Sequence, residues 1–262
     1  MTDILERTNS QAEAEPKGDT PRLEAIDIKD KRIVVTGGTT GIGRATVRLL
    51  AAGGAKLFVI GRKQESLDET RALDPANIDG TTGDVARQED IEASFQKAAE
   101  ALGGIDIAIV AAGLPGGGLS DMSAKDARYM LDVNFTAEAM CAHAAYQHME
   151  EGDIVLIGST SAHDLTPGST VYAGAKAGVA GFAEALRREL GPKGVRVTLV
   201  EPGLTGTDIH GPGCDRDTQQ RMIEAEEMLK AEDIAAAIHF ALTRPRRAVV
   251  QSISVVPRNS SE

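Results

Sequence analysis

The stretch RIVVTGGTTGIGRATVRLLAAGG (residues 32–54) decides the fold, because it joins a buried strand to a helix through a glycine-rich turn. Its first residues are typical of a strand buried on both faces, and its later apolar residues recur at helical intervals until a Gly-Gly pair ends the helix. Gly37 permits the tight turn, Gly41 lets the backbone approach a pyrophosphate, and Gly43 lets the helix pack against the strand. The N–H groups that open the helix can bind phosphate. The stretch therefore predicts a dinucleotide-binding unit, with a glycine-rich turn that binds nothing as the alternative.

The same alternation of strand and helix continues along the chain. Further strands are expected at 56–60, 78–85, 105–113, 152–159, 195–203 and 248–256, and helices at 66–73, 88–102, 124–149, after residue 171 and at 231–243. Strands that alternate with helices form right-handed crossovers and a parallel sheet covered on both faces. The pattern predicts a Rossmann-type, doubly wound, three-layer α/β/α sandwich with a seven-stranded parallel sheet.

The first 28 residues differ from the rest, being polar, acidic on balance and interrupted by proline and glycine. Such a segment buries too little apolar surface to offset the cost of ordering it. We expect residues 1–28 to form a flexible acidic tail, with a partner-binding arm as the alternative. Residues 29–262 are expected to form a single dinucleotide-binding domain.

Composition excludes several classes of function. The 262 residues carry a net charge of −11, which argues against a nucleic-acid surface. Cys141 and Cys214 are far apart and lack the spacing of metal ligands, so neither a disulfide framework nor a metal site is expected. No apolar run is long enough to cross a membrane, and the N-terminus lacks the apolar core of a secretion signal. We expect a soluble, cytoplasmic protein without a membrane partner.

The spacing TGxxxGxG at 36–43, followed by YAGAK at 172–176, resembles the short-chain dehydrogenase/reductase family in its shorter, single-domain branch. The resemblance covers residues 30–257. It implies an enzyme that transfers hydride between a nicotinamide cofactor and a carbonyl or alcohol. It also implies a homo-oligomer, a dimer or homotetramer, that assembles through the helices at 124–149 and 171–190.

The candidate catalytic residues are Asn134, Ser159, Tyr172 and Lys176. A phenol titrates near about 10, and a cation one helical turn away favours its ionised form, so Tyr172 beside Lys176 can serve as a general acid/base. Ser159 ends a predicted strand, where open α/β sheets bind ligands. The resemblance implies that Ser159 holds the substrate oxygen, with Ser161 as a competitor, and that Lys176 bonds the nicotinamide ribose. The resemblance also implies that Asn134 holds a water molecule that links Lys176 to solvent. The alternative is that Asn134 is a polar residue inside a helix whose side chain bonds the backbone.

The sequence favours NADP(H) over NAD(H). Arg62 follows the second strand, where members of the family that use NAD carry Asp, and a planar guanidinium suits a 2′-phosphate. The alternative is that Arg62 and Lys63 form a solvated turn. By resemblance, Asp84 and Val85 contact adenine. The full set expected to bind the cofactor is Gly37, Thr39, Thr40, Gly41, Ile42, Gly43, Arg62, Lys63, Asp84, Val85, Ala111, Ala112, Gly113, Tyr172, Lys176, Pro202, Gly203, Leu204, Thr205 and Thr207.

One motif departs from the family pattern. The fourth strand ends in Val-Ala-Ala-Gly (110–113) where the family shows Asn-Asn-Ala-Gly. The missing asparagine removes a structural hydrogen bond and puts the bracing of this turn in doubt.

Three segments are expected to line the substrate site, at 114–120, 161–169 and 206–222, and the last is long enough for a lid. They are polar, rich in glycine and nearly free of aromatic residues, which favours a small polar carbonyl or alcohol over a large apolar substrate. His163 and His210 are candidate substrate contacts, with solvated loop histidines as the alternative. The sequence thus predicts an NADP-dependent oxidoreductase. A catalytically silent NADP-binding sensor or scaffold is the alternative.

Overall fold

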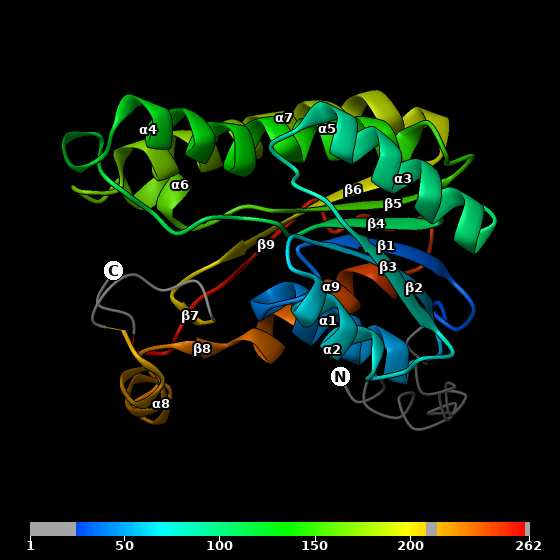
Figure 1. The fold of residues 1–262 in the computed structure, drawn as a ribbon, viewed down its shortest axis with the longest axis horizontal. Helices are drawn as coiled ribbons and strands as arrows, with labels where there is room; N and C mark the ends of the chain where they lie inside the picture. Colours follow the sequence, from blue (N-terminus) through cyan, green and yellow to red (C-terminus); the bar gives the residue numbers. More distant parts are fainter. Residues whose placement is uncertain (1–24, 208–213, 260–262) are drawn as a thin grey trace, which may run out of the picture.

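The computed structural model describes residues 25–207 and 214–259 and contains the predicted parallel sheet (Figure 1). Seven strands, all parallel, lie in the order β3-β2-β1-β4-β5-β6-β9. Their bounds are β1 Arg32–Thr36, β2 Lys56–Gly61, β3 Ile78–Thr82, β4 Ile107–Val110, β5 Gly152–Ile157, β6 Val195–Pro202 and β9 Ser252–Val255. The order reverses between β1 and β4, and open α/β sheets bind their ligands at such a switch point. The predicted fold class is confirmed.

Helices cover both faces of the sheet (Figure 1). One face carries α1 Gly41–Ala52, α2 Gln64–Arg71 and α9 Ala231–Leu242, and the other carries α3 Gln88–Leu102, α5 Ala137–Tyr146 and α7 Thr170–Leu190. Alternation along β1 divides the core in two: Ile33 and Val35 pack with α1 and α9, and Val34 packs with α3, α5 and α7. Because the sheet is covered on both faces, the inner strands β1, β2, β4 and β5 are nearly continuous apolar runs, whereas the edge strands β3 and β9 are partly exposed.

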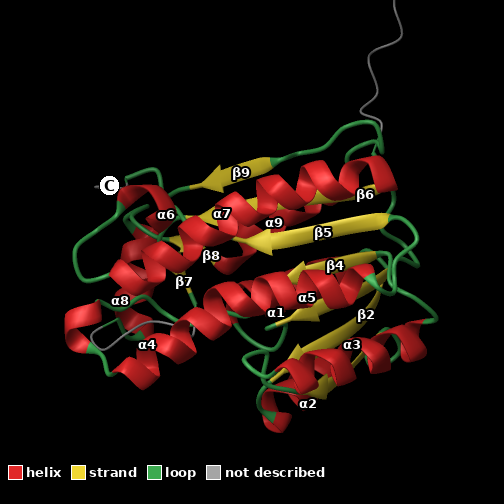
Figure 2. Cartoon of the chain, turned by 90° about the horizontal axis from the view of Figure 1, so that it is seen from above, coloured by secondary structure: helices red, strands yellow, loops and turns green. Residues whose placement is uncertain are grey.

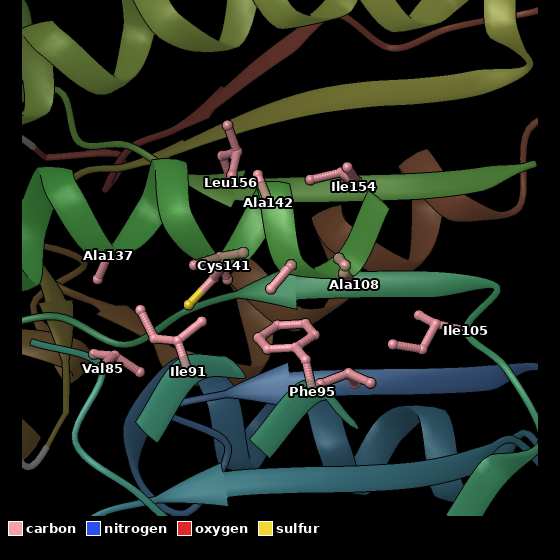
Figure 3. Close-up of a cluster of buried hydrophobic side chains, with 14 of the residues drawn as sticks. Val85, Ile91, Phe95, Ile105, Ala108, Ala137, Cys141, Ala142, Ile154 and Leu156 are labelled. Carbon is pink, nitrogen blue, oxygen red and sulfur yellow. The ribbon is translucent and has the colours of Figure 1, made fainter. Parts of the chain in front are cut away.

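Small side chains dominate the core under α5. Ala137, Cys141 and Ala142 of this helix belong to one buried cluster with Phe95 of α3 and Leu156 of β5 (Figure 3). An aromatic content of only 3% requires such packing, because few large side chains are present to fill the space. The short side chains of α5 let this helix lie close to the sheet.

The strands all point toward one edge of the molecule, where α4 (Ala124–Leu131), α6 (Ser161–Asp164) and α8 (Arg216–Glu224) lie (Figure 2). This carboxyl edge is therefore the place where loops from several strands can meet around a ligand. In the ranges that the structure describes, no helix combines the length and apolar character needed to cross a bilayer.

Several expected boundaries are corrected. The helix expected at 124–149 is divided into α4 and α5 by a π-helical segment, η2 (Asp132–Thr136), and it ends at Tyr146. The last strand is shorter than 248–256. Ile28 is buried in the core and the Ile26 N–H donates to the Thr243 carbonyl at 2.9 Å, so the packed chain begins before residue 29. Residues 1–24 of the expected tail lie outside the described residues.

The sequence analysis also missed some short elements. They are the 3₁₀ turns η1 Leu119–Asp121 and η3 Gly191–Lys193, the helices α6 and α8, and a two-stranded pairing of β7 (Thr205–Gly206) with β8 (Leu229–Lys230). The elements other than α8 have no room for a helical or strand period, and α8, although nine residues long, buries none of its residues, so no apolar pattern marks any of them.

Candidate active site

A cleft of about 660 Å³ lies at the carboxyl edge of the sheet. Loops that follow β1, β2, β3, β4, β5 and β6 line it, together with η2 and the first turns of α7. All residues predicted to be catalytic line this cleft, and so do all those predicted to bind the cofactor except Gly41 and Lys63. The structure therefore brings together side chains from residue 37 to residue 207 of the chain.

The glycine turn after β1 leaves no room for side chains. Gly37 has φ +65°, and a Cβ there would lie 2.7 Å from the Ala112 Cα. A Cβ on Gly43 would overlap the carbonyl oxygen of Gly37. Both positions therefore require glycine. The absence of side chains lets this turn lie close to the turn after β4 and lets a ligand approach its backbone.

The N-terminus of α1 has the features of a phosphate site. Its N-cap, Thr40, makes no side-chain capping bond, and its first turn contains no acidic residue. The opening N–H groups and the positive end of the helix dipole are therefore open to an anion. Gly41 and Thr207 line an adjacent cleft of about 450 Å³, and a Cβ on Gly41 would lie 3.1 Å from the Thr207 Cβ. These residues fit the pyrophosphate of a dinucleotide.

Arg62 and Asp84 meet at one end of the cleft through a tyrosine that the sequence analysis missed. The Tyr129 hydroxyl accepts from Arg62 at 3.2 Å and lies 3.2 Å from an Asp84 carboxylate oxygen, to which it can donate. Asp84 also accepts from the Ala86 N–H at 3.0 Å. Lys63 is exposed at the N-cap of α2, outside the cleft. Tyr129 precedes Asn134 by five residues, and nothing in its spacing distinguishes it from a packing residue.

The turn after β4 is braced without the missing asparagine. The Thr36 hydroxyl accepts from the Ala111 and Ala112 N–H groups at 3.2 and 3.4 Å. The Asn134 amide accepts from the Leu114 N–H at 2.9 Å and donates to the Leu114 carbonyl at 3.3 Å. The π-helical segment carries Asn134, and such segments are frequent at functional sites. Asn134 thus bonds backbone, but across the cleft edge rather than within its own helix.

Tyr172 and Lys176 lie one turn apart near the start of α7. The Lys176 ammonium is 6.0 Å from the centre of the Tyr172 ring. Lys176 is buried, and its Nζ donates to the Ile157 carbonyl at 2.6 Å. Ser159 is buried, and its hydroxyl oxygen accepts from the Ser161 N–H at 3.2 Å. Both serines line the cleft, so the structure keeps Ser161 as a neighbour of Ser159.

A second missed residue, Glu138 on α5, lies behind this pair. Its Oε1 is 3.5 Å from the Lys176 Nζ, and the whole residue is buried. Burial raises the pKa of Glu138 to about 8, although the Lys176 cation opposes the rise. Glu138 follows Asn134 by one helical turn, and that spacing is the signal that could have found it.

Neither candidate substrate histidine is found among the described residues that line the cleft, for different reasons. His163 lies on α6 and outside the cleft lining, and its Nε2 is 2.9 Å from a carboxylate oxygen of the buried Glu201. His210 lies outside the described residues, as does part of the expected lid. Across residues 25–207 and 214–259, no group of three or more His, Cys, Asp or Glu side chains could hold a metal ion.

Several known proteins are similar to this chain. The family model described as short chain dehydrogenase matches residues 31–216. An uncharacterized oxidoreductase of Staphylococcus aureus (strain USA300) is 33% identical over 235 residues, which are 88% of this chain and 98% of that protein.

Two solved structures are also similar. A short chain dehydrogenase from Burkholderia cenocepacia J2315 in complex with NADP has a TM-score of 0.80 and 32% identity, covering 88% of this chain and 98% of its own. A dehydrogenase/reductase from Sinorhizobium meliloti 1021 has a TM-score of 0.79 and 28% identity, covering 87% of this chain and 94% of its own. With its parallel sheet, glycine turn and Tyr-Lys helix, the chain belongs to the short-chain dehydrogenase/reductase family of oxidoreductases.

Proposed function

We propose that this chain is an NADP(H)-dependent oxidoreductase that transfers hydride between the nicotinamide and the carbonyl or alcohol carbon of a small polar substrate. One observation carries the proposal: Tyr172, Lys176 and Ser159 line the same cleft as the glycine turn. A cofactor whose pyrophosphate lies on α1 can extend from that turn toward the Tyr-Lys pair. When bound, the nicotinamide supplies or accepts the hydride.

In the direction of reduction, Tyr172 donates its phenolic proton to the substrate oxygen as negative charge develops there, and in oxidation it takes the proton back. Ser159 donates a hydrogen bond to the same oxygen. Its hydroxyl oxygen already accepts from the Ser161 N–H, which leaves the hydroxyl proton for the substrate. Lys176 provides the positive charge that favours the phenolate and binds the hydroxyls of the nicotinamide ribose.

In this proposal Asn134 positions the loop that follows β4. Its two hydrogen bonds to Leu114 fix the loop that follows β4 against η2. The loop borders the cleft at Gly113 and Leu114, so its position sets the space beside the cofactor. A water held near the π-helical turn would link Lys176 to solvent and reload Tyr172 after each turnover.

The preference for NADP(H) rests on Arg62. Its guanidinium is exposed at the cleft edge and is held by the Tyr129 hydroxyl, which suits it to an incoming phosphate dianion. The similar structure from Burkholderia cenocepacia holds NADP, which supports the same choice. A charge-assisted bond of this kind contributes roughly 1.5–3 kcal/mol.

The substrate class is inferred from the loops around the cleft. Among the cleft residues of the loops that follow β4 and β5, Pro115, Gly116, Ser161 and Ser169 are small or polar, and Leu114 is the one large apolar side chain. A site built from small and polar groups discriminates poorly among large apolar molecules and favours a small polar carbonyl or alcohol. The direct experiment is a panel of small ketones, aldehydes and hydroxy acids, followed by NADPH absorbance. Turnover of a polar member supports the proposal, whereas tight NADPH binding without turnover of any member supports a silent sensor.

We also propose that the protein is a homo-oligomer that assembles through α5 and α7. Gly174 and Gly181 on α7 are open on their outer side, since a Cβ at either would meet nothing within 4 Å. Phe135, next to Gly178 of α7, is 36% exposed. Light scattering of the purified chain tests the proposal, and a monomer at micromolar concentration contradicts it.

A further inference from the structure

Glu138 carries a buried carboxyl group that has no role in the proposed reaction. It does not line the cleft but contacts Lys176, whose ammonium is in turn 6.0 Å from the centre of the Tyr172 ring. Its Oε1 is 3.5 Å from the Lys176 Nζ, and its Oε2 is buried and makes no hydrogen bond to any described residue. A buried carboxylate oxygen without a partner costs free energy, so its retention next to Lys176 requires a reason.

The surroundings of Glu138 hold few other charges. From α7 it contacts Lys176, which lies 6.0 Å from the centre of the Tyr172 ring. On its own helix the titratable neighbour is Cys141. Burial raises the pKa of the Cys141 thiol, and Glu138 adds to the rise, so this thiol remains neutral. The residues that α3, β4 and β5 contribute to the core next to α5 are apolar, namely Ile91, Phe95, Ala98, Ala108, Val110, Ile154 and Leu156. Lys176 is therefore the one cation in the described surroundings that Glu138 can influence.

The charge of Glu138 has a definite effect on the Tyr-Lys pair. While its carboxyl is protonated, the full positive charge of Lys176 acts on the phenol and favours its ionisation. Once the carboxyl ionises, Lys176 is shared between two acidic groups, and the phenolate is favoured less. The pKa of Glu138, about 8, puts this change within the pH range in which such enzymes operate.

We propose that Glu138 is a positioning residue that acts through Lys176, and that its negative charge keeps Tyr172 protonated at pH values at which Lys176 alone would let the phenol ionise. The inference rests on the proposed function of Tyr172. Above about pH 8, where its carboxyl is ionised, Glu138 biases the active site toward proton donation, the direction of reduction. A protonated Tyr172 is the form required to reduce a carbonyl.

The test is a titration of the Tyr172 phenolate by ultraviolet absorbance in the full-length protein, with Tyr172→Phe as the reference that identifies the signal. Glu138→Gln removes the charge and keeps the shape. We expect the midpoint of the Tyr172 titration to fall by roughly one pH unit, because the phenolate is no longer repelled by the Glu138 carboxylate. The carboxylate lies 3.5 Å from the Lys176 Nζ, which is 6.0 Å from the centre of the Tyr172 ring. The ionisation should also change from two coupled steps to one. Glu184→Gln, which removes an exposed carboxylate from α7, should leave the midpoint unchanged.

Two further measurements keep the test decisive. Glu138→Met replaces the carboxyl by an apolar side chain of similar size and should give the same shift as Glu138→Gln. A shift in Glu138→Met alone would indicate repacking and overturn the inference, as would coincident midpoints in the wild type and Glu138→Gln. With an active substrate, the acidic limb of kcat/KM for oxidation, which requires the ionised Tyr172, should move to lower pH by the same amount. The phenolate titration needs no substrate, so its outcome is separate from that of the activity test on Tyr172→Phe.

Discussion

The protonation of Glu138 predicts how the stability of the protein depends on pH. The perturbation is Glu138→Gln, which cannot ionise. In the native state burial raises the pKa of this carboxyl from its ordinary value of 4.5 to about 8, so the native state binds more protons than the unfolded state between these values. Its contribution to the free energy of unfolding is therefore complete below pH 4.5, declines as the pH rises, and is lost above pH 8.

The size of the effect follows from the two pKa values. One unit corresponds to about 1.4 kcal/mol, so the difference sets a ceiling of about 5 kcal/mol. Structural relaxation and water penetration reduce such values, and we expect an observed change of about 2–3 kcal/mol. Relative to the wild type, Glu138→Gln should become more stable by this amount as the pH rises from 5 to 9.

The assay is urea unfolding of both proteins at a series of pH values, because the difference between them cancels the titration of all other groups. Glu184→Gln serves as the matched control. Its carboxyl is exposed and its pKa is lowered to about 2 by the side-chain bonds to Arg187 and Arg188, so its effect should be constant between pH 5 and 9. A difference between wild type and Glu138→Gln that does not change over this range would refute the reasoning.

Three other predictions follow from the cleft and the core. Arg62→Ser should raise the Kd for NADPH roughly 10- to 150-fold, equivalent to about 1.5–3 kcal/mol, and leave the Kd for NADH nearly unchanged; an equal loss for both cofactors in titration calorimetry would contradict the phosphate assignment. Gly43→Ala should destabilise the fold by about 1–3 kcal/mol and weaken NADPH binding, because the added Cβ overlaps a backbone carbonyl oxygen, whereas Gly191→Ala, at a helical backbone position where an added Cβ meets nothing within 4 Å, should not destabilise it. A thiol reagent should label only Cys214 in the native protein and both cysteines in denaturant, because Cys141 is buried and its pKa is raised; rapid labelling of Cys141 in the native protein would show that the core under α5 opens.

The sequence predicted those features that depend on local pattern. Apolar runs such as RIVVT identify strands buried on both faces, and the glycines at 37 and 43 mark a turn with no room for a Cβ. The Tyr172–Lys176 pair is separated by one helical turn, so its geometry follows from its spacing. These features need no knowledge of which distant residues meet.

The remaining features depend on contacts between distant parts of the chain. The π-helical segment adds a residue to one turn without changing the apolar pattern on either side, so the stretch at 124–149 looks like one helix. Tyr129 meets Arg62 only because α4 folds over the edge of the sheet, and His163 pairs with Glu201 of a strand 38 residues away. Glu138 looks like a solvated helix residue in the sequence, and only the packing of α5 against α7 puts it beside Lys176.

The measurement that tests the central claim most directly is the rate of NADPH oxidation by the wild type and by Tyr172→Phe, on a substrate that the wild type reduces. We expect kcat to fall by about 10²–10⁴-fold, the range contributed by a general acid, while the Kd for NADPH stays within a few-fold because the fold and the phosphate site are intact. A Tyr172→Phe protein that retains the activity of the wild type would contradict the assignment of Tyr172 as the proton donor.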